Sequence, residues 1–471
     1  MSLHKEEDLK IQFDGSRGGR FALTRGQLDV YRSLGAYAPA LGVFNIRGTV
    51  PVPPGTGVDQ VCDVLRWAVE RYEALRTTYP SDPAGGPFQF VRRTGEINVG
   101  VYELHGDEQA SEVIPPGFGQ DFDHASEVPL RITLLTWVGE PVRVALEISH
   151  LSLDLVGWRI LERAVARRLA GQSTAGPDRV YQPADRAGDE DSAAGRAANE
   201  RAVSYSDRIL SGHRTPLFEP LGNYPGDTPR CPRARIGSHA LGVAVGLISG
   251  RHRVTASTVH LTSMAVLMAA WSGAERFAFS VTSSNRWLPG GSDYVGTLNQ
   301  FALASIDLTG ADLPELLERM QRAGLEAHAH ASYNIDDLAA LGHADGVGSV
   351  DCVFNTFQRT DRRLPAADLD PERLRDLLPR TVVEEVAPFP ATARRRSLHL
   401  LVSGPTDRPE LWLCTDRHVL PEVDPAAALR TLESVFVDFA RDPGPYLGVP
   451  VAAALAEAAA RCGTSALFGT G

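Results

Sequence analysis

The residues best suited to chemistry lie together in one short segment, 147–158, with the sequence EISHLSLDLVGW. His150 stands where an alternating strand pattern ends and a helical pattern begins, and Asp154 follows among apolar neighbours. An imidazole titrates near neutral pH, so it can deprotonate an attacking amine or hydroxyl. A strand end is also a rigid support for such a group. The segment therefore marks His150 as a candidate general base.

The local pattern leaves two other interpretations open. A histidine at the end of a strand is more often a structural residue whose ring nitrogens are hydrogen-bonded. The spacing of His150 and Asp154 also suits two metal ligands, but no third ligand stands nearby in the sequence. We therefore predict no metal site.

Most other catalytic patterns are absent from the chain. It contains no G-x-S-x-G, no H-E-x-x-H, and no G-x-G-x-x-G between a strand and a helix. Lysine occurs only at Lys5 and Lys10, which argues against a P-loop, a Schiff-base lysine and a kinase-type ATP site. The five cysteines are far apart and form no C-x-x-C pair, which favours reduced thiols over a disulfide framework or a zinc finger.

Composition and charge indicate an ordinary globular protein of 471 residues, long enough for two or three domains. The 47 basic and 58 acidic side chains give a formal net charge of −11, which disfavours nucleic acid or an anionic membrane as a main partner. The first residues carry acids where a signal peptide needs an apolar run, and the most apolar stretch, 264–271, is too short to cross a bilayer. We expect a cytoplasmic location.

Two predicted elements position the histidine. Residues 142–148 alternate between apolar and polar and predict a half-buried strand. The apolar stripe that follows has helical spacing: Val156, Ile160, Leu161, Val165, Leu169. Earlier in the chain, 57–76 shows the same spacing and predicts an amphipathic helix. His150 is thus expected in a strand-to-helix turn.

The rest of the chain continues this mixture of strands and helices. Further helices are predicted at 200–211, 255–272, 312–330 and 424–440, and further strands at 276–282, 349–357, 397–403 and 410–415. The tract 171–200 is polar and acidic without apolar periodicity, which favours an interdomain linker. We predict an α+β protein with a lobe at 1–172, a linker at 173–199 and a second lobe at 200–471.

Six segments, in the right order, resemble motifs of the condensation-domain superfamily of nonribosomal peptide synthetases. They are LTRGQLDVY (23–31), RYEALRTTY (71–79), FDHASEVPLRITLL (122–135), SHLSLDLVGW (149–158), VGTLNQFAL (295–303) and HASYNIDDL (330–338). The fourth is similar to the H-H-x-x-x-D-G core of that family. The second is similar to its R-H-E-x-L-R-T-x-F helix end, with Tyr72 in place of the histidine.

This resemblance implies a fold and an activity. The fold would be a V-shaped pseudo-dimer of two chloramphenicol-acetyltransferase-like lobes, each a mixed sheet flanked by helices, with His150 in a tunnel between them. Carrier proteins would present substrates on phosphopantetheine arms, and the amine or alcohol of an acceptor would attack the thioester of a donor. No intrinsically bound cofactor is implied, and the family favours a monomer.

Matched residue by residue, His150 takes the position that the family associates with catalysis. Asp154 takes the position of a structural aspartate, which pairs with an arginine, and Arg286 fits that arginine. The chain departs from the family at Ser149, which replaces the first histidine, and at Leu155, which replaces the glycine after the aspartate. Leu155 adds bulk near His150 and would narrow the tunnel, and Gly157 is a further neighbour of the site.

Three interpretations of the function follow. The first is a free-standing condensation enzyme of natural-product (antibiotic) biosynthesis, an acyltransferase that forms an amide or ester, with partners supplied in trans. The second is a catalytically silent condensation-like domain that binds carrier proteins or recruits a tailoring enzyme, which the changes at Ser149 and Leu155 favour. The third is acyl-CoA-dependent transfer without a carrier protein. The sequence names neither substrate.

Overall fold

The structure is a computed structural model that describes residues 3–37, 41–104, 114–172, 180–213, 215–219, 230–343, 350–358, 370–388, 398–451, 453–454 and 456–457. The chain divides into two compact units. Unit 1 comprises Met1–Glu200, Ser284–Gln300 and Ser332–Ile335, and unit 2 comprises Arg201–Ser283, Phe301–Ala331 and Asp336–Gly471. Two segments from the second half of the sequence therefore belong to unit 1.

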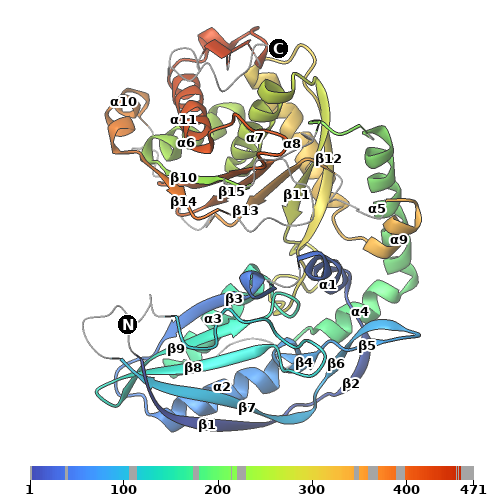
Figure 1. Ribbon diagram of the computed structural model, residues 1–471, viewed down its shortest axis with the longest axis vertical. Helices are drawn as coiled ribbons and strands as arrows, with labels where there is room; N and C mark the ends of the chain where they lie inside the picture. Colours follow the sequence, from blue (N-terminus) through green and yellow to red (C-terminus); the bar gives the residue numbers. More distant parts are fainter. Residues whose placement is uncertain are drawn as a thin grey trace. The chain divides into compact units, whose positions relative to one another are not determined.

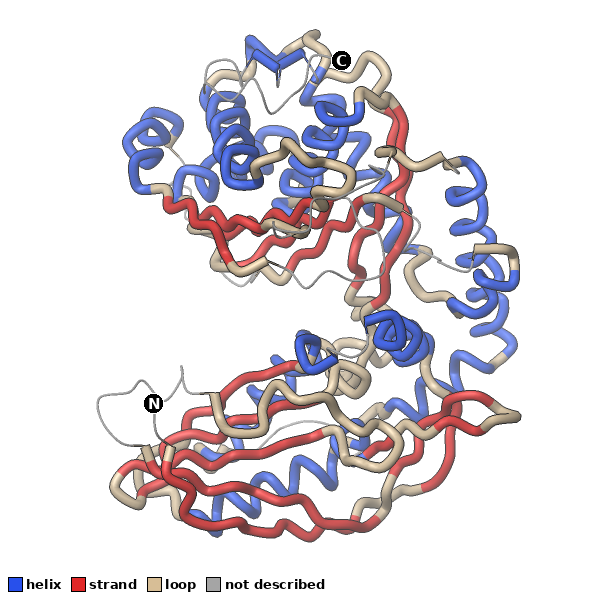
Figure 2. Tube along the Cα trace, in the orientation of Figure 1, coloured by secondary structure: helices blue, strands red, loops and turns tan. Residues whose placement is uncertain are grey.

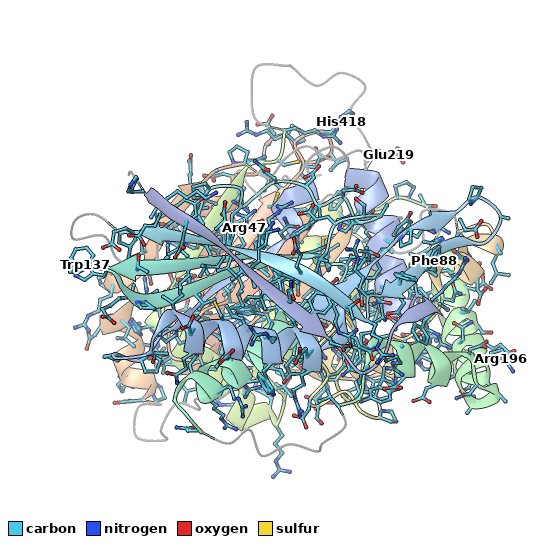
Figure 3. All side chains as sticks on the ribbon, turned by 90° about the horizontal axis from the view of Figure 1, so that it is seen from below. Arg47, Phe88, Trp137, Arg196, Glu219 and His418 are labelled. Carbon is cyan, nitrogen blue, oxygen red and sulfur yellow. The ribbon has the colours of Figure 1, made fainter. Side chains whose placement is uncertain are left out.

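The centre of unit 1 is a mixed five-stranded sheet in the order β1-β7-β8-β9-β3 (Figure 1). Its strands are β1 (His4–Asp14), β7 (Thr94–Glu103), β8 (Leu130–Trp137), β9 (Glu140–Ile148) and β3 (Ile46–Pro51). Only β7 and β8 are parallel, and the other neighbours are antiparallel. Trp137 lies at the tip of the β8–β9 hairpin, as labelled in Figure 3.

Two helices cover this sheet and close the core of unit 1. They are α2 (Val58–Arg71) and α3 (Leu155–Leu169), which contact each other and the strands β1 and β3. The prediction of an apolar helical stripe is confirmed at Leu161, Val165 and Leu169, which are buried in this core. Gly48 on β3 leaves room for the Trp158 ring of α3.

A buried charge lies on the face of β9 opposite its apolar side chains. Glu147 is fully buried and forms ion pairs with Arg47 on β3, at 2.7 Å, and Arg131 on β8, at 3.0 Å. Arg47 is labelled in Figure 3. Because each partner comes from a neighbouring strand, the pairs fix the end of β9 from both sides, just before the turn that carries His150.

The remaining elements of unit 1 are short. A small sheet joins β2 (Gly19–Ala22), β6 (Gly86–Val91), β4 (Thr77–Thr78) and β5 (Ser81–Asp82). The helical elements are α1 (Arg25–Tyr37), η1 (Leu41–Phe44), η2 (Glu73–Arg76) and α4 (Pro183–Asp191). The helix predicted at 57–76 is thus α2 followed by η2, with Tyr72 between them.

The tract predicted as a linker is largely helical, which corrects that expectation. Residues 173–179 lie outside the described residues, but α4 and α5 (Ala193–Gly212) follow them. Helix α4 buries Ala184 and Ala187, and its Arg186 forms an ion pair with Glu190 at 3.0 Å between two nearly buried side chains. Alanines and paired charges leave no large apolar stripe in the sequence, which is why periodicity missed this helix.

Unit 2 contains a mixed seven-stranded sheet in the order β12-β11-β13-β15-β16-β10-β14. The strands are β12 (Gln300–Asp307), β11 (Arg276–Ser283), β13 (Cys352–Thr356), β15 (Leu398–Ser403), β16 (Glu410–Thr415), β10 (Arg233–Gly237) and β14 (Val382–Val386). The pairs β11–β13 and β13–β15 are parallel, and those from β15 to β14 are antiparallel.

Four long helices pack on one side of this sheet (Figure 2). They are α6 (His239–His252), α7 (Ala256–Ser272), α8 (Leu313–Ala329) and α11 (Pro425–Arg441), and the shorter elements are α9 (Ile335–Ala340), η5 (Pro371–Arg373), α10 (Leu374–Leu377), η6 (Leu378–Arg380) and η7 (Gly444–Tyr446). In the described part of the chain no single helix is long and apolar enough to cross a membrane. The pair α6 and α7 passes that test only jointly, bent by 104°.

The fold class predicted from the sequence is confirmed, since each unit is a mixed sheet covered by helices. The helices α7, α8 and α11 and the strands β11, β13, β15 and β16 of unit 2 fall where periodicity placed them, within a few residues. In the two large sheets the strands β1, β3, β7, β10, β12 and β14 were not predicted, and neither was the helix α6. Helix α6 is apolar almost all round, so it lacks the polar face that marks an amphipathic helix.

Candidate functional site

His150 lies in the short turn that joins β9 to α3, inside unit 1. Its Nδ1 lies 3.1 Å from the carbonyl oxygen of Leu153. A carbonyl can only accept a hydrogen bond, so in the neutral ring Nδ1 carries the proton and Nε2 carries the lone pair. The side chain is half-buried, and its Nε2 has no hydrogen-bond partner in the described part of the chain.

Asp154 caps the helix that follows. It is the N-cap residue of α3, and its Oδ1 accepts a hydrogen bond from the backbone N–H of Gly157 at 2.7 Å. A side-chain oxygen at this position satisfies an amide that the first turn of a helix leaves without a partner. Asp154 is only 2% exposed, so its charge needs further donors.

Those donors come from the segment 284–300, which belongs to unit 1 although it lies far along the sequence. Arg286 forms an ion pair with Oδ1 of Asp154, and the backbone N–H groups of Leu298 and Asn299 donate to Oδ2 at 2.9 and 3.2 Å. Arg286 also donates to the carbonyl oxygens of Tyr294, at 2.7 Å, and Gly296. One carboxylate thus joins the start of α3 to a segment 130 or more residues later in the sequence.

The same segment reaches the backbone of the histidine. Thr297 donates from Oγ1 to the carbonyl oxygen of His150 at 2.7 Å. The approach is close, since a Cβ atom added to Gly157 would lie 2.8 Å from Leu153 Cδ1 and 3.0 Å from the carbonyl oxygen of Gly296. A glycine is therefore needed at position 157 for this packing. From the sequence, Gly157 was expected only to lie near the site.

The two departures from the family pattern have different surroundings. Leu155 is the first residue of α3, and its side chain is half-buried against the core of unit 1. Ser149 is only 1% exposed and hydrogen-bonds His124, at 2.7 Å between the hydroxyl and Nε2. His124 lies in the segment 122–135 that resembles a family motif, but no pattern in the sequence singles out this residue.

Residues from two other segments that resemble family motifs lie close to the same turn. Tyr79 lies 2.8 Å from Ser152, hydroxyl to hydroxyl, and Gln27 donates to the Tyr79 hydroxyl at 3.4 Å. Gln27 and Thr24 also exchange hydrogen bonds between side chain and backbone at the start of α1. Such reciprocal bonds form a capping box, which fixes the direction in which the helix begins. Family resemblance was the only sequence signal that could group these distant residues.

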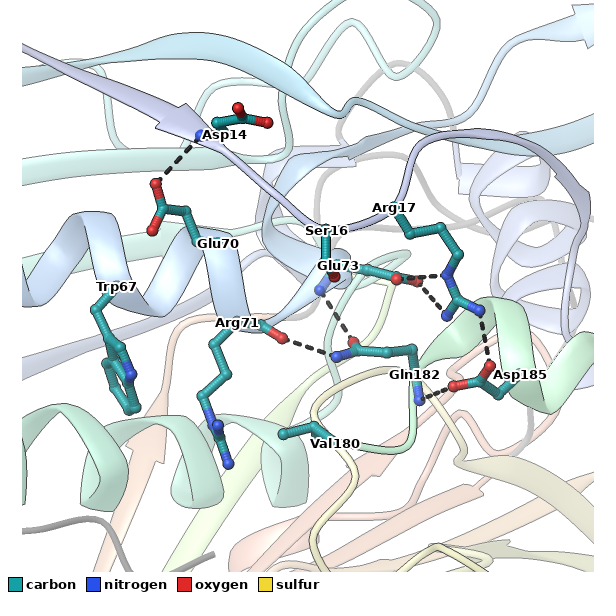
Figure 4. Close-up of a pocket in the computed structure, with 10 residues that line it drawn as sticks. All are labelled: Asp14, Ser16, Arg17, Trp67, Glu70, Arg71, Glu73, Val180, Gln182 and Asp185. Atoms are coloured by element: carbon teal, nitrogen blue, oxygen red, sulfur yellow. Dashed lines mark hydrogen bonds and ion pairs between the residues drawn. The ribbon is translucent and has the colours of Figure 1, made fainter. Parts of the chain in front are cut away.

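A pocket of about 530 Å³ lies elsewhere in unit 1 (Figure 4). Arg17 bridges Glu73, at 2.6 Å, and Asp185, at 2.7 Å, along its wall. Gln182 accepts from the Glu73 backbone N–H and donates to the Arg71 carbonyl oxygen. These polar contacts tie α4 to the end of α2, so we assign them a structural role.

Comparison with known proteins identifies the family of this chain. A family model described as the condensation domain matches residues 36–361. The chain belongs to the condensation-domain family. It is 25% identical over 306 residues to surfactin synthase subunit 2 of Bacillus subtilis (strain 168), covering 63% of this chain and 8% of that protein. The chain therefore spans a small part of the length of that relative.

Solved condensation domains have the same fold. The condensation domain of the monacolin K polyketide synthase MokA superposes with a TM-score of 0.67 at 16% identity, covering 90% of this chain and 98% of that one. The X-domain in complex with OxyB from teicoplanin biosynthesis gives a TM-score of 0.62 at 16% identity, covering 91% and 95%. At these identities the likeness establishes the fold alone.

Condensation domains of nonribosomal peptide synthetases generally form amide bonds by acyl transfer and work with carrier proteins. The described residues of this condensation domain contain no group of three or more histidine, cysteine, aspartate or glutamate side chains arranged to hold a metal ion. The turn that carries the His150 imidazole is held in place by Asp154 and by segment 284–300.

Proposed function

We propose that this condensation domain is an acyltransferase that joins a carrier-bound acyl or aminoacyl thioester to an amine or alcohol. The observation that carries the proposal is the state of His150, whose Nδ1 faces a carbonyl oxygen and whose Nε2 has no partner among the described residues. A base needs a lone pair that points away from its own structural contacts, and this ring supplies one.

In the proposed reaction, His150 Nε2 takes the proton of the attacking amine or hydroxyl. The nucleophilic atom bonds to the thioester carbon, the carbon–sulfur bond breaks, and the phosphopantetheine thiol leaves with a proton. Asp154 does not reach the reacting atoms, because its oxygens are occupied by Arg286 and by backbone N–H groups. Its role is to hold the turn.

A silent domain that recruits a tailoring enzyme is the second candidate. Two observations favour it: Ser149 and Leu155 replace the histidine and glycine of the family pattern, and the similar X-domain was solved in complex with OxyB. The retained His150, Asp154 and Arg286 oppose it, because a purely docking role has no use for a free imidazole nitrogen.

The test compares donors. The protein is incubated with phosphopantetheinylated carrier proteins, each loaded with one of a panel of acyl or aminoacyl groups, and with amine or alcohol acceptors. The same acyl groups on coenzyme A form a parallel arm. We expect product from carrier-bound donors only. Product from coenzyme A thioesters at the same rate would support transfer without a carrier. Carrier binding with no product from any donor would support the silent domain.

A further inference from the structure

A histidine outside the motif reaches into the turn that carries His150. His124 comes from the loop before β8, and its Nε2 lies 2.7 Å from the hydroxyl oxygen of Ser149. The backbone of this loop is fixed as well, because the Tyr79 N–H donates to the His124 carbonyl oxygen at 2.6 Å and the Ser149 N–H donates to Pro129 at 3.1 Å. The side-chain bond therefore forms between two anchored backbones.

A serine beside an imidazole resembles a nucleophile with its base, but the surroundings of Ser149 argue against that role. Ser149 is only 1% exposed, so no substrate carbonyl can approach its hydroxyl. The same oxygen also accepts the Leu151 N–H at 3.2 Å. The hydroxyl is committed to two contacts inside the fold, which is the pattern of a structural group.

These contacts continue to the ring of His150. The bond from Leu151 N–H to the Ser149 hydroxyl closes a tight turn with His150 at its centre. The Ser149 carbonyl oxygen accepts from the N–H groups of Ser152, at 3.0 Å, and Leu153, at 3.2 Å. Leu153 in turn presents the carbonyl oxygen that faces His150 Nδ1. An unbroken path thus runs from His124 to the atom that sets the tautomer of His150.

We propose that His124 and Ser149 form a positioning pair that fixes the turn around His150 and, through the Leu153 carbonyl, keeps the lone pair on His150 Nε2. Ser149 stands where the family pattern has a histidine, and His124 supplies an imidazole to that place from another loop. The proposal deepens the proposed function and rests on it for its effect on rate. Neither residue of the pair touches the substrate.

The test uses two substitutions of similar size at His124. His124→Phe keeps the ring shape but removes both nitrogens, whereas His124→Gln keeps a donor and an acceptor near the position of Nε2. We expect His124→Phe to lower kcat by about 10- to 100-fold with little change in KM, since a misplaced catalytic group costs rate and not binding. His124→Gln should restore most of the loss.

A second readout does not depend on activity. Nitrogen-15 NMR of the histidine rings, with the His150 signals assigned from a His150→Gln variant, reports which nitrogen carries the proton. We expect a single Nδ1–H tautomer in the wild type and in His124→Gln, and a mixture of tautomers in His124→Phe. If the wild type forms no product but the three proteins still show these tautomers, the proposed function fails and the positioning pair stands.

Ser149→Ala tests the other half of the pair with a smaller change, in case His124→Phe does not fold. It should give the same loss of kcat and the same mixture of tautomers. Unchanged kcat and tautomer in a folded Ser149→Ala or His124→Phe protein would overturn the proposal. A covalent acyl group on Ser149, detected by mass spectrometry during turnover, would also overturn it, because Ser149 would then be a nucleophile.

Discussion

Asp154 illustrates how one side chain can combine a local and a long-range role. It caps α3 through Gly157 and pairs with Arg286 from a segment far along the chain. Removing one partner of a buried ion pair leaves the other charge without compensation, which typically costs about 3–5 kcal/mol. The pair also closes the contact between α3 and segment 284–300, so its loss is expected to loosen both.

We expect Asp154→Ala and Arg286→Ala each to lower the free energy of unfolding by about 3–5 kcal/mol. The double variant should lose clearly less than the sum, because each single change already breaks the shared interaction. The measurement is denaturant unfolding of the wild type and the three variants. Glu96→Ala is the matched control, because its ion pair with Lys10 is exposed and should contribute only about 0–1 kcal/mol. Additive losses would contradict the pairing as the source of stability.

A second prediction at the residue scale concerns His260 on α7. This side chain is 1% exposed, and neither ring nitrogen has a hydrogen-bond partner among the described residues. Burial lowers the pKa of His260 from 6.5 to about 4. Between pH 4 and pH 6.5 His260 is protonated in the unfolded chain but neutral in the folded chain. The free energy of unfolding is therefore highest above about pH 6.5 and falls as the pH drops toward 4.

A pKa of about 4 in the folded chain against 6.5 in the unfolded chain corresponds to a loss on the order of 3 kcal/mol across this window. We expect His260→Leu to remove that part of the pH dependence, measured as the difference in urea midpoint between pH 7.5 and pH 4.5. His239→Ala, on a half-buried histidine at the start of α6, is the control and should keep the wild-type difference. An unchanged difference in His260→Leu would show that His260 is not the group responsible.

At the scale of elements, the start of α3 and segment 284–300 depend on a close backbone approach. Gly157 permits it, since a methyl group there would meet Leu153 and Gly296. Gly157→Ala should therefore lower the free energy of unfolding by about 1–3 kcal/mol, although alanine favours a helix. Gly35→Ala on α1 has open space around its Cβ and should instead stabilise by up to about 1 kcal/mol. Melting temperatures that shift in the same direction would contradict this account.

The elements also show what the sequence could and could not predict. Periodicity located β9 and α3, and family resemblance located Asp154 and its arginine partner. Periodicity could not find α4, whose buried side chains are alanines and paired charges. It also could not link His124 to Ser149, because a single hydrogen bond between two loops leaves no pattern in the spacing of residues.

At the scale of the whole molecule, the sequence suggested a first lobe that ends at residue 172, but unit 1 takes in α4 and the segment 284–300. Val295 from that segment lies in the core of unit 1, and Asp154 depends on the segment for its donors. A fragment 1–172 would thus leave a buried carboxylate unpaired and part of the core open to water.

We expect the fragment 1–172 to lack the cooperative thermal transition that the full chain shows by circular dichroism. A synthetic peptide of residues 284–300 should bind the fragment poorly on its own, because α4 is also missing. A fragment that unfolds cooperatively at the melting temperature of the full chain would show that unit 1 does not need these segments.

In the proposed reaction His150 Nε2 is the base of an acyl transfer, on a turn fixed by other residues. This role is tested by the single-turnover rate of product formation from a loaded carrier protein, for the wild type, His150→Gln and the control His239→Ala. We predict that His150→Gln slows the reaction by about 10²- to 10⁴-fold, while its melting temperature and carrier binding match the wild type. A folded His150→Gln protein that forms product at the wild-type rate would contradict the assignment.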